Sequence, residues 1–137
     1  MPEGWSTVTP GLFYDDIDSA LEWLERVFGL AACVRIPGGD GKTLHAELQI
    51  GDQFISIEAA LRHDDASQSP HTLGGTAHAI YIYVPDVDAH AARSRLEGAT
   101  IDAELQNKHF GDRTYSVIDL EGHRWTFQQR IEADFDV

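Results

Sequence analysis

The fold of this chain is decided by a short stretch that occurs twice, first as Phe13-Tyr14-Asp15-Asp16-Ile17-Asp18 and later as Tyr83-Val84-Pro85-Asp86-Val87-Asp88. Each copy ends an apolar run and precedes a helical pattern, and Gly29 and Gly98 follow at nearly the same distance. An aspartate before a helix accepts hydrogen bonds from the free amides, and a glycine suits the left-handed turn beyond the last residue. The stretch therefore predicts a strand followed by a capped helix at two places in the chain.

A second pair of matching segments follows the first pair in the same order. One segment contains Lys42-Thr43-Leu44, then Gly51 and Phe54, and the other contains Arg113-Thr114-Tyr115, then Gly122 and Trp125. Repetition of this kind indicates that one structural unit is used more than once. Together the two pairs predict two tandem βαβββ units.

The spacing of apolar residues predicts the elements within each unit. A stripe at three- and four-residue spacing predicts a helix over 20–28, and Ala89, Ala92 and Leu96 form a weaker stripe in the second unit. Alternating or continuous apolar runs predict strands at 7–14, 44–50, 54–58, 79–84, 113–118 and 124–129. Gly51-Asp52 predicts a tight turn in one hairpin, and Asp119-Leu120-Glu121-Gly122 predicts the turn of the matching hairpin.

The length of the chain favours one domain built from both units. It has 137 residues, which is the size of a common single domain. We expect unit one at about 5–60, a polar linker at about 61–75 and unit two at about 76–130, and we place His63 and His71 in the linker and His90 and His123 on the surface.

The charge of the chain excludes several classes of partner. The net charge is −13, so phosphate backbones and anionic membranes are repelled, and we expect neither nucleic acid nor a membrane as partner. We find no apolar run long enough to span a bilayer, and the polar start of the sequence leads us to expect no secretory signal. The single cysteine, Cys33, cannot form an internal disulfide, which favours a cytoplasmic location.

The second copy of the hairpin carries a resemblance to a known family. The run Gly111-Asp112-Arg113-Thr114-Tyr115-Ser116-Val117-Ile118-Asp119-Leu120-Glu121-Gly122-His123-Arg124-Trp125-Thr126-Phe127 resembles the C-terminal signature of glyoxalase/bleomycin-resistance/dioxygenase proteins, the vicinal oxygen chelate superfamily. The resemblance covers about 8–129. It implies an α+β fold in which the two tandem βαβββ units form a curled mixed β-sheet cup with flanking helices.

The same resemblance implies where a metal would bind. Metal-dependent members place His, Gln or Glu near the start of the first strand and near the end of the last strand of each unit, and these positions carry over to Thr9, Ile55, Ala79 and Thr126. None of these four is a reliable metal ligand. We therefore expect no metal and no cofactor. A shifted register in which His45, Glu47, His78 or Glu58 supplies ligands remains the alternative.

Several residues are candidates for contact with a small molecule. Tyr81 and Tyr83 share the face of Ala79, Phe13 shares the face of Thr9, and His45 alternates with Glu47 on a polar strand face. Arg113 carries a planar fork that suits an anionic group, or it pairs with one of the many carboxylates. A solvated strand face or ordinary core packing explains the same residues without a ligand. The expected ligand-binding residues are Phe13, His45, Glu47, Ile57, Tyr81, Tyr83, Phe110, Arg113 and Tyr115, with no catalytic residue.

These observations favour a metal-free small-molecule binding protein that resembles bleomycin-resistance proteins. It would act as a homodimer in antibiotic resistance by sequestering an aromatic or cationic ligand. A metal-dependent lyase, isomerase or dioxygenase of the same superfamily is the alternative, so whether the chain is an enzyme stays open. A third possibility is a protein whose cavity is filled by side chains.

Overall fold

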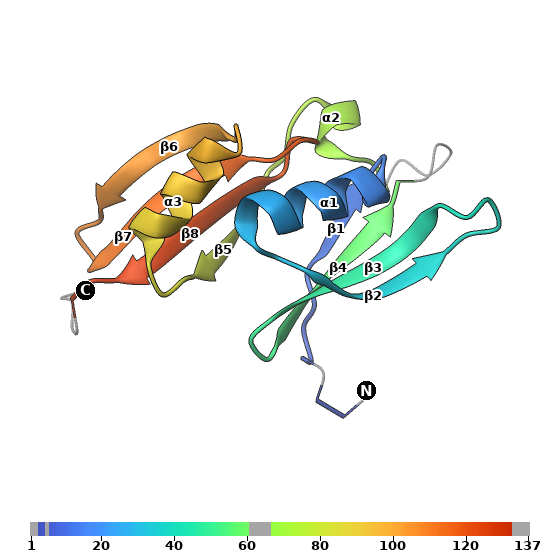
Figure 1. The fold of residues 1–137 in the computed structure, drawn as a ribbon, viewed down its shortest axis with the longest axis horizontal. Coiled ribbons are helices and arrows are strands. Elements are labelled where there is room, and N and C mark those ends of the chain that lie inside the picture. The colour runs from blue at the N-terminus through green and yellow to red at the C-terminus, as the bar shows by residue number, and fades with distance from the viewer. Residues whose placement is uncertain (1–2, 5, 61–66, 133–137) are drawn as a thin grey trace. The chain divides into compact units, whose positions relative to one another are not determined.

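A computed structural model describes residues 3–4, 6–60 and 67–132 (Figure 1). The chain divides into two compact units, Met1–Gly75 and Thr76–Val137, and each is described by itself. Residues 61–66, which include His63, lie outside the described residues.

Unit one contains one βαβββ motif followed by a short helix. Its elements are β1 (Gly11–Tyr14), α1 (Ile17–Phe28), β2 (Ala32–Pro37), β3 (Thr43–Ile50), β4 (Gln53–Ala59) and α2 (Pro70–Leu73). The sheet order is β1-β4-β3-β2, in which β1 and β4 are parallel and the other neighbours are antiparallel.

Unit two repeats the motif. Its elements are β5 (Ala79–Tyr83), α3 (Val87–Leu96), β6 (Thr100–Asn107), β7 (Asp112–Ile118) and β8 (Arg124–Arg130). The order β5-β8-β7-β6 matches that of unit one, again with one parallel pair. The α+β class and the two tandem βαβββ units are therefore confirmed. Each sheet is open, and a cup shared by the two sheets stays a prediction.

The aspartates of the repeated stretch begin the two long helices. The carboxylate of Asp16 accepts a hydrogen bond from the Ser19 amide at 3.1 Å, and that of Asp86 accepts from the Ala89 amide at 3.0 Å. Gly29 ends α1 with a φ of 75°, where a side chain is strained. The capped-helix prediction is thus confirmed in both units.

Each long helix covers one face of its own sheet (Figure 1). In unit one, five of the sheet side chains under α1 are at most 1% exposed, namely Leu12, Tyr14, Ala46, Leu48 and Ile57. In unit two Trp125 and Phe127 are fully buried on the α3 side. Burial of such side chains contributes roughly 1.5–3 kcal/mol each, and this makes the helix side the core of each unit.

The apolar stripe predicted for the second helix is wrong. Val87, Ala91 and Ser94 are the buried residues of α3, whereas Ala92 is exposed and Leu96 is 86% exposed. The Asp86 cap fixes where the helix begins and therefore which of its residues face the sheet. The sheet beneath the helix offers a hydroxyl group, so a polar residue of the helix can be buried there. The Tyr115 hydroxyl lies 2.8 Å from the Ser94 hydroxyl and also contacts the His90 ring nitrogen.

The two histidines predicted to lie on the surface of unit two are more buried than expected. His90 is only partly exposed, and its ring lies 4.0 Å from that of Phe127 between centroids. His123 is 4% exposed.

The last part of the predicted linker packs on unit one. Ser69 is fully buried, its hydroxyl donates to Oδ2 of Asp15 at 2.8 Å, and it accepts from the Thr72 amide at 3.2 Å to begin α2.

The pattern of apolar residues does not predict the residue ranges of the two edge strands, β2 and β6. Both carry register shifts against their neighbours, which break the alternation by which strands are detected. Among the described residues, no helix has the length and apolar content to cross a bilayer.

The turn between β7 and β8 is organised by one buried carboxylate. Asp119 is 5% exposed, and its Oδ1 accepts from the amides of Glu121 at 3.0 Å and His123 at 2.9 Å. Its Oδ2 accepts from Nε1 of Trp125 at 2.9 Å. The predicted turn is confirmed, with Gly122 at a φ of 96°.

We expect Asp119→Ala to destabilise the chain by about 3 kcal/mol, because it leaves buried donors without an acceptor. Urea unfolding followed by tryptophan fluorescence measures this change. The matched control is Asp52→Ala in the β3–β4 turn, where the side chain is exposed, and it should stay within about 0.5 kcal/mol of the parent. Equal losses in the two variants would contradict the assigned role of Asp119.

Candidate functional site on the open faces of the two sheets

Each sheet has a face opposite its long helix, which we call its open face. On the open face of unit one, cross-strand pairing forms two rows of side chains. One row runs Phe13, Glu58, His45, Ile36, and the next runs Gly11, Ser56, Glu47, Val34. The polar side chains lie in the middle strands and the apolar ones lie at the edges.

The middle of this face holds an imidazole–carboxylate cluster, made of His45, Glu47, Ser56 and Glu58. Nδ1 of His45 lies 2.6 Å from Oε1 of Glu58, and Nε2 lies 3.1 Å from Oε1 of Glu47. The Ser56 hydroxyl donates to the same Glu58 oxygen at 2.5 Å. Because carboxylates only accept, both ring nitrogens donate when the imidazole carries its second proton.

The cluster alters the proton affinity of its histidine. Partial burial alone would lower the pKa of His45, but the hydrogen bonds and charges of Glu47 and Glu58 outweigh it and raise the pKa above its ordinary value. Oε2 of Glu47 is buried and has no hydrogen-bond partner among the described residues. The cluster therefore has more acceptor capacity than its own donors satisfy.

The open face of unit two carries exposed tyrosines, neutral hydroxyl and amide groups, and the cations Lys108 and Arg124. Tyr81 is 61% exposed and borders a concavity of about 280 Å³. The concavity is lined by Tyr81, Ala103, Gln106, Lys108, Phe110, Thr114, Ser116, Arg124, Thr126 and Gln128. The hydroxyls of Ser116 and Thr126 bond one another at 2.8 Å. Such a surface suits a planar ligand that stacks on a ring and is oriented by a few polar groups.

Tyr83 lies beside this concavity on the same face. Its hydroxyl donates to Oδ2 of the buried Asp112 at 2.7 Å, and this hydrogen bond raises the pKa of Tyr83. Nε of Arg130 lies 3.1 Å from the other Asp112 oxygen. The ring of Tyr83 is thereby held in place while 55% of the residue stays exposed.

The structure brings together only part of the predicted site. Phe13, His45 and Glu47 share the open face of unit one, and Tyr81, Tyr83 and Phe110 gather on that of unit two. Ile57 and Tyr115 are buried on the helix side, and burial raises the pKa of Tyr115 to about 12. Arg113 points to α3, where its NH2 group lies 3.1 Å from Oδ1 of Asp88.

Sequence reasoning missed Ser56 as a site residue and kept Glu58 only as a ligand in a shifted register, because Ile55, three residues away, implies the opposite face for Glu58. It took Ile55 as the cavity position, yet Ile55 is 4% exposed and pairs with Leu48 on the helix side. A signal was present. The predicted two-residue turn at Gly51-Asp52 implies that Ile50 pairs with Gln53, and counting back from there pairs His45 with Glu58.

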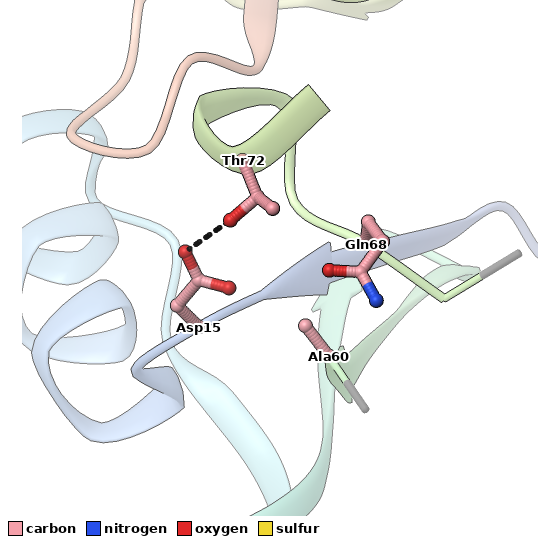
Figure 2. A pocket seen from close by; sticks show the side chains of 4 residues that line it. All are labelled: Asp15, Ala60, Gln68 and Thr72. Carbon is pink, nitrogen blue, oxygen red and sulfur yellow. Dashed lines mark hydrogen bonds between the residues drawn. The ribbon is translucent and has the colours of Figure 1, made fainter. Parts of the chain in front are cut away.

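Two further pockets lie at the end of unit one where α1 begins. Figure 2 shows the first, of about 420 Å³, lined by Asp15, Ala60, Gln68 and Thr72. Oδ2 of Asp15 accepts there from the hydroxyls of Ser69 and Thr72. The second, of about 360 Å³, contains Asp18, which accepts from the amide and hydroxyl of Thr43, and these bonds lower the pKa of Asp18. These carboxylates hold the local fold together.

The carried-over metal positions do not fit a metal ion. Ile55 and Ala79 offer no donor atom, and the side chain of Ile55 points away from the open face. Glu58 and His45 do meet on the open face, but both ring nitrogens of His45 are hydrogen-bonded to carboxylates. Across residues 3–4, 6–60 and 67–132, no group of three or more His, Cys, Asp or Glu side chains is arranged to hold a metal.

Comparison with known proteins places these features in a family. The sequence model of the Glyoxalase/Bleomycin resistance protein/Dioxygenase superfamily matches residues 7–127 of this chain. Uncharacterized protein Rv0887c of Mycobacterium tuberculosis H37Rv is 34% identical, over 94% of this chain and 78% of that protein.

Two solved structures extend the comparison. TioX from Micromonospora sp. ML1 is 36% identical with a TM-score of 0.74, over 91% of this chain and 98% of that one. The fosfomycin resistance protein FosX from Listeria monocytogenes is 16% identical with a TM-score of 0.65, over 90% of this chain and 92% of that one. The likeness to FosX concerns the fold alone.

We expect His45 to titrate above the ordinary histidine value of about 6.5, and Glu58→Gln to lower its pKa. NMR of the ring Cε1–H during a pH titration measures both. The folded state binds this proton more tightly than the unfolded chain does. The protonated His45 therefore stabilises the fold below the pKa of the unfolded chain, and this contribution is lost as the pH rises through the pKa of the folded state. Asp52→Asn, a change at an exposed carboxylate of the same hairpin, should leave the titration unaltered. A parent pKa at or below the ordinary value would contradict the assigned cluster.

Proposed function

The chain belongs to the glyoxalase/bleomycin resistance protein/dioxygenase superfamily, and we propose that it is a small-molecule binding protein that sequesters an aromatic or cationic ligand without a metal. The observation that carries this proposal is the pair of open faces, one lined by exposed tyrosines and the other by the imidazole–carboxylate cluster. The family name alone does not decide between binding and catalysis, because one fold hosts many activities.

The proposed mechanism is burial of the ligand and involves no bond-making step. On unit two a ring of the ligand stacks on Tyr81 and fills the concavity of about 280 Å³ beside Phe110. Neutral hydroxyl and amide groups such as those of Thr126 and Gln128 orient it. The open face of unit one, with Phe13, His45 and Glu47, offers a second surface for a polar or charged ligand.

The remaining predicted residues act from behind these surfaces. Ile57 and Tyr115 pack under the sheets, and Arg113 fixes the start of β7 against α3 through Asp88. Removal of a toxic compound by such a protein would confer antibiotic resistance. A cytoplasmic homodimer is the form in which we propose that it acts.

A metal-dependent lyase, isomerase or dioxygenase is the second candidate, and the observation that favours it is that His45, Glu47 and Glu58 share one sheet face, so that they could supply ligands if their mutual hydrogen bonds were broken. Mass-spectrometric elemental analysis of protein purified without chelators separates the two. Stoichiometric zinc, nickel, iron or manganese, together with turnover that depends on it, would replace the binding function by the enzymatic one.

We expect isothermal titration to detect binding of at least one aromatic compound among bleomycin, ethidium and anilinonaphthalene sulfonate. Tyr81→Ala should weaken that binding about tenfold, which corresponds to roughly 1.4 kcal/mol and to the loss of one aromatic contact. Leu96→Ala removes an apolar side chain that is 86% exposed on α3 and should leave the affinity unchanged. The proposal fails if none of the three compounds binds with a Kd below about 1 mM.

A further inference from the structure

The imidazole–carboxylate cluster is not required by the βαβββ fold. Strand pairing places Thr114, Ser116, Thr126 and Gln128 in unit two where unit one has His45, Glu47, Ser56 and Glu58. Unit two builds the same sheet with neutral hydroxyl and amide groups at all four positions. Partly buried charges cost desolvation energy, so their presence at these positions in unit one, and not at the matching positions in unit two, points to a role other than holding the sheet together.

The charge balance of the cluster indicates what it lacks. It has two carboxylates and one imidazole, so it stays negative even when His45 is protonated. His45, Glu47 and Glu58 have side-chain exposures of 25%, 15% and 34%, which leaves Glu58 the most accessible carboxylate. The buried Oε2 of Glu47 has no donor among the described residues. A hydrogen-bond donor with a positive charge would satisfy both deficits.

The edges of the open face provide room and an apolar wall for such a group. Gly11 of β1 pairs with Ser56 of β4, and a Cβ added at Gly11 would meet nothing within 4 Å. Phe13 pairs with Glu58, so an aromatic ring stands next to the exposed carboxylate. On the other side, Val34 and Ile36 of β2 pair with Glu47 and His45. A cation that enters beside Gly11 therefore meets a carboxylate and a ring together, as cation–π recognition requires.

We propose that the open face of unit one binds the protonated nitrogen group of an organic cation, an ammonium or amidinium, with Glu58 and Glu47 as its acceptors and His45 as the group that gives up a proton. This inference rests on the proposed binding function and specifies the ligand class and the residues that select it. The Ser56 hydroxyl, which donates to Glu58 at 2.5 Å, holds that carboxylate in position.

Proton release follows from the same geometry. The groups that face His45 and can carry charge are Glu47 on its own strand and Glu58 on β4, while the paired residues of β1 and β2 are apolar or glycine. A cation placed at Glu58 repels the imidazolium, so each disfavours the other. By linkage, the ligand binds more tightly as the pH rises and His45 becomes neutral.

Benzamidine, an aromatic amidinium, tests the proposal against benzamide, its neutral counterpart of the same shape. Amide and His45 resonances are followed by NMR during titration to about 20 mM, because a fragment of this size binds in the millimolar range. We expect benzamidine to shift His45 and the residues around Glu58, to bind at least about tenfold more tightly than benzamide, and to bind about fivefold more tightly at about pH 8.5 than at about pH 5.5.

Variants assign the effect to individual groups. Glu58→Gln should weaken benzamidine binding about tenfold, and His45→Gln should keep binding but remove its pH dependence. Glu22→Gln is the matched control, because it removes the same charge from unit one at a site on α1 that is 63% exposed. It should change neither affinity nor pH profile. Thermal melts of each variant show that a loss of binding is not a loss of fold.

Equal affinity for benzamidine and benzamide, or no shift of His45 by benzamidine at either pH, would overturn the inference. Failure of this inference differs from failure of the proposed function. If aromatic compounds bind through Tyr81 but show no preference for cations, the binding function stands and the cation site falls. If neither class of compound binds, both fall.

Discussion

The two-residue turn at Gly51-Asp52 is the constraint on which the open face of unit one depends. Gly51 has a φ of 61°, and the turn it permits pairs Ile50 with Gln53. Because side chains alternate between faces, that single pair sets every pair beyond it, including His45 with Glu58. A turn longer by one residue would move one strand of the pair by one position and separate the imidazole from its carboxylate. The turn therefore determines which side chains meet on this face, although it lies several residues away.

The two units keep the same helix side and differ on the open side. Asp16 and Asp86 cap equivalent helices, and each helix covers a buried sheet face. Opposite the helix, the four central positions include three ionisable groups in unit one and only neutral hydroxyl and amide groups in unit two, where exposed tyrosines stand beside them. The helix side is fixed by burial, which tolerates few polar groups, whereas the open side is free to change. The repeat therefore supplies one scaffold with two chemically distinct surfaces.

The doubled unit, the helix caps and the hairpin turns could be predicted from the sequence, because each depends on local residues such as Asp16 and Gly51. The phase of α3 could not, since its docking residue Ser94 is polar and a search for apolar stripes passes over it. Glu58 was misplaced because a family position at Ile55 was carried over without counting the register from the turn. Ligand identity lies beyond this reasoning, because an open face constrains the charge and shape of a ligand and leaves its structure undetermined.

The hydroxyl contacts beneath α3 limit how the two units can be recombined. α1 rests on its sheet through apolar side chains, which accept many partners of similar volume. α3 instead depends on the hydrogen bonds that Ser94 and His90 share with the Tyr115 hydroxyl of β7, and hydrogen bonds require a defined geometry. A chimaera that exchanged the helices alone would leave that hydroxyl buried without its partners. In protein engineering, α3 and β7 would therefore have to be transferred together, although the repeat makes the two helices look interchangeable.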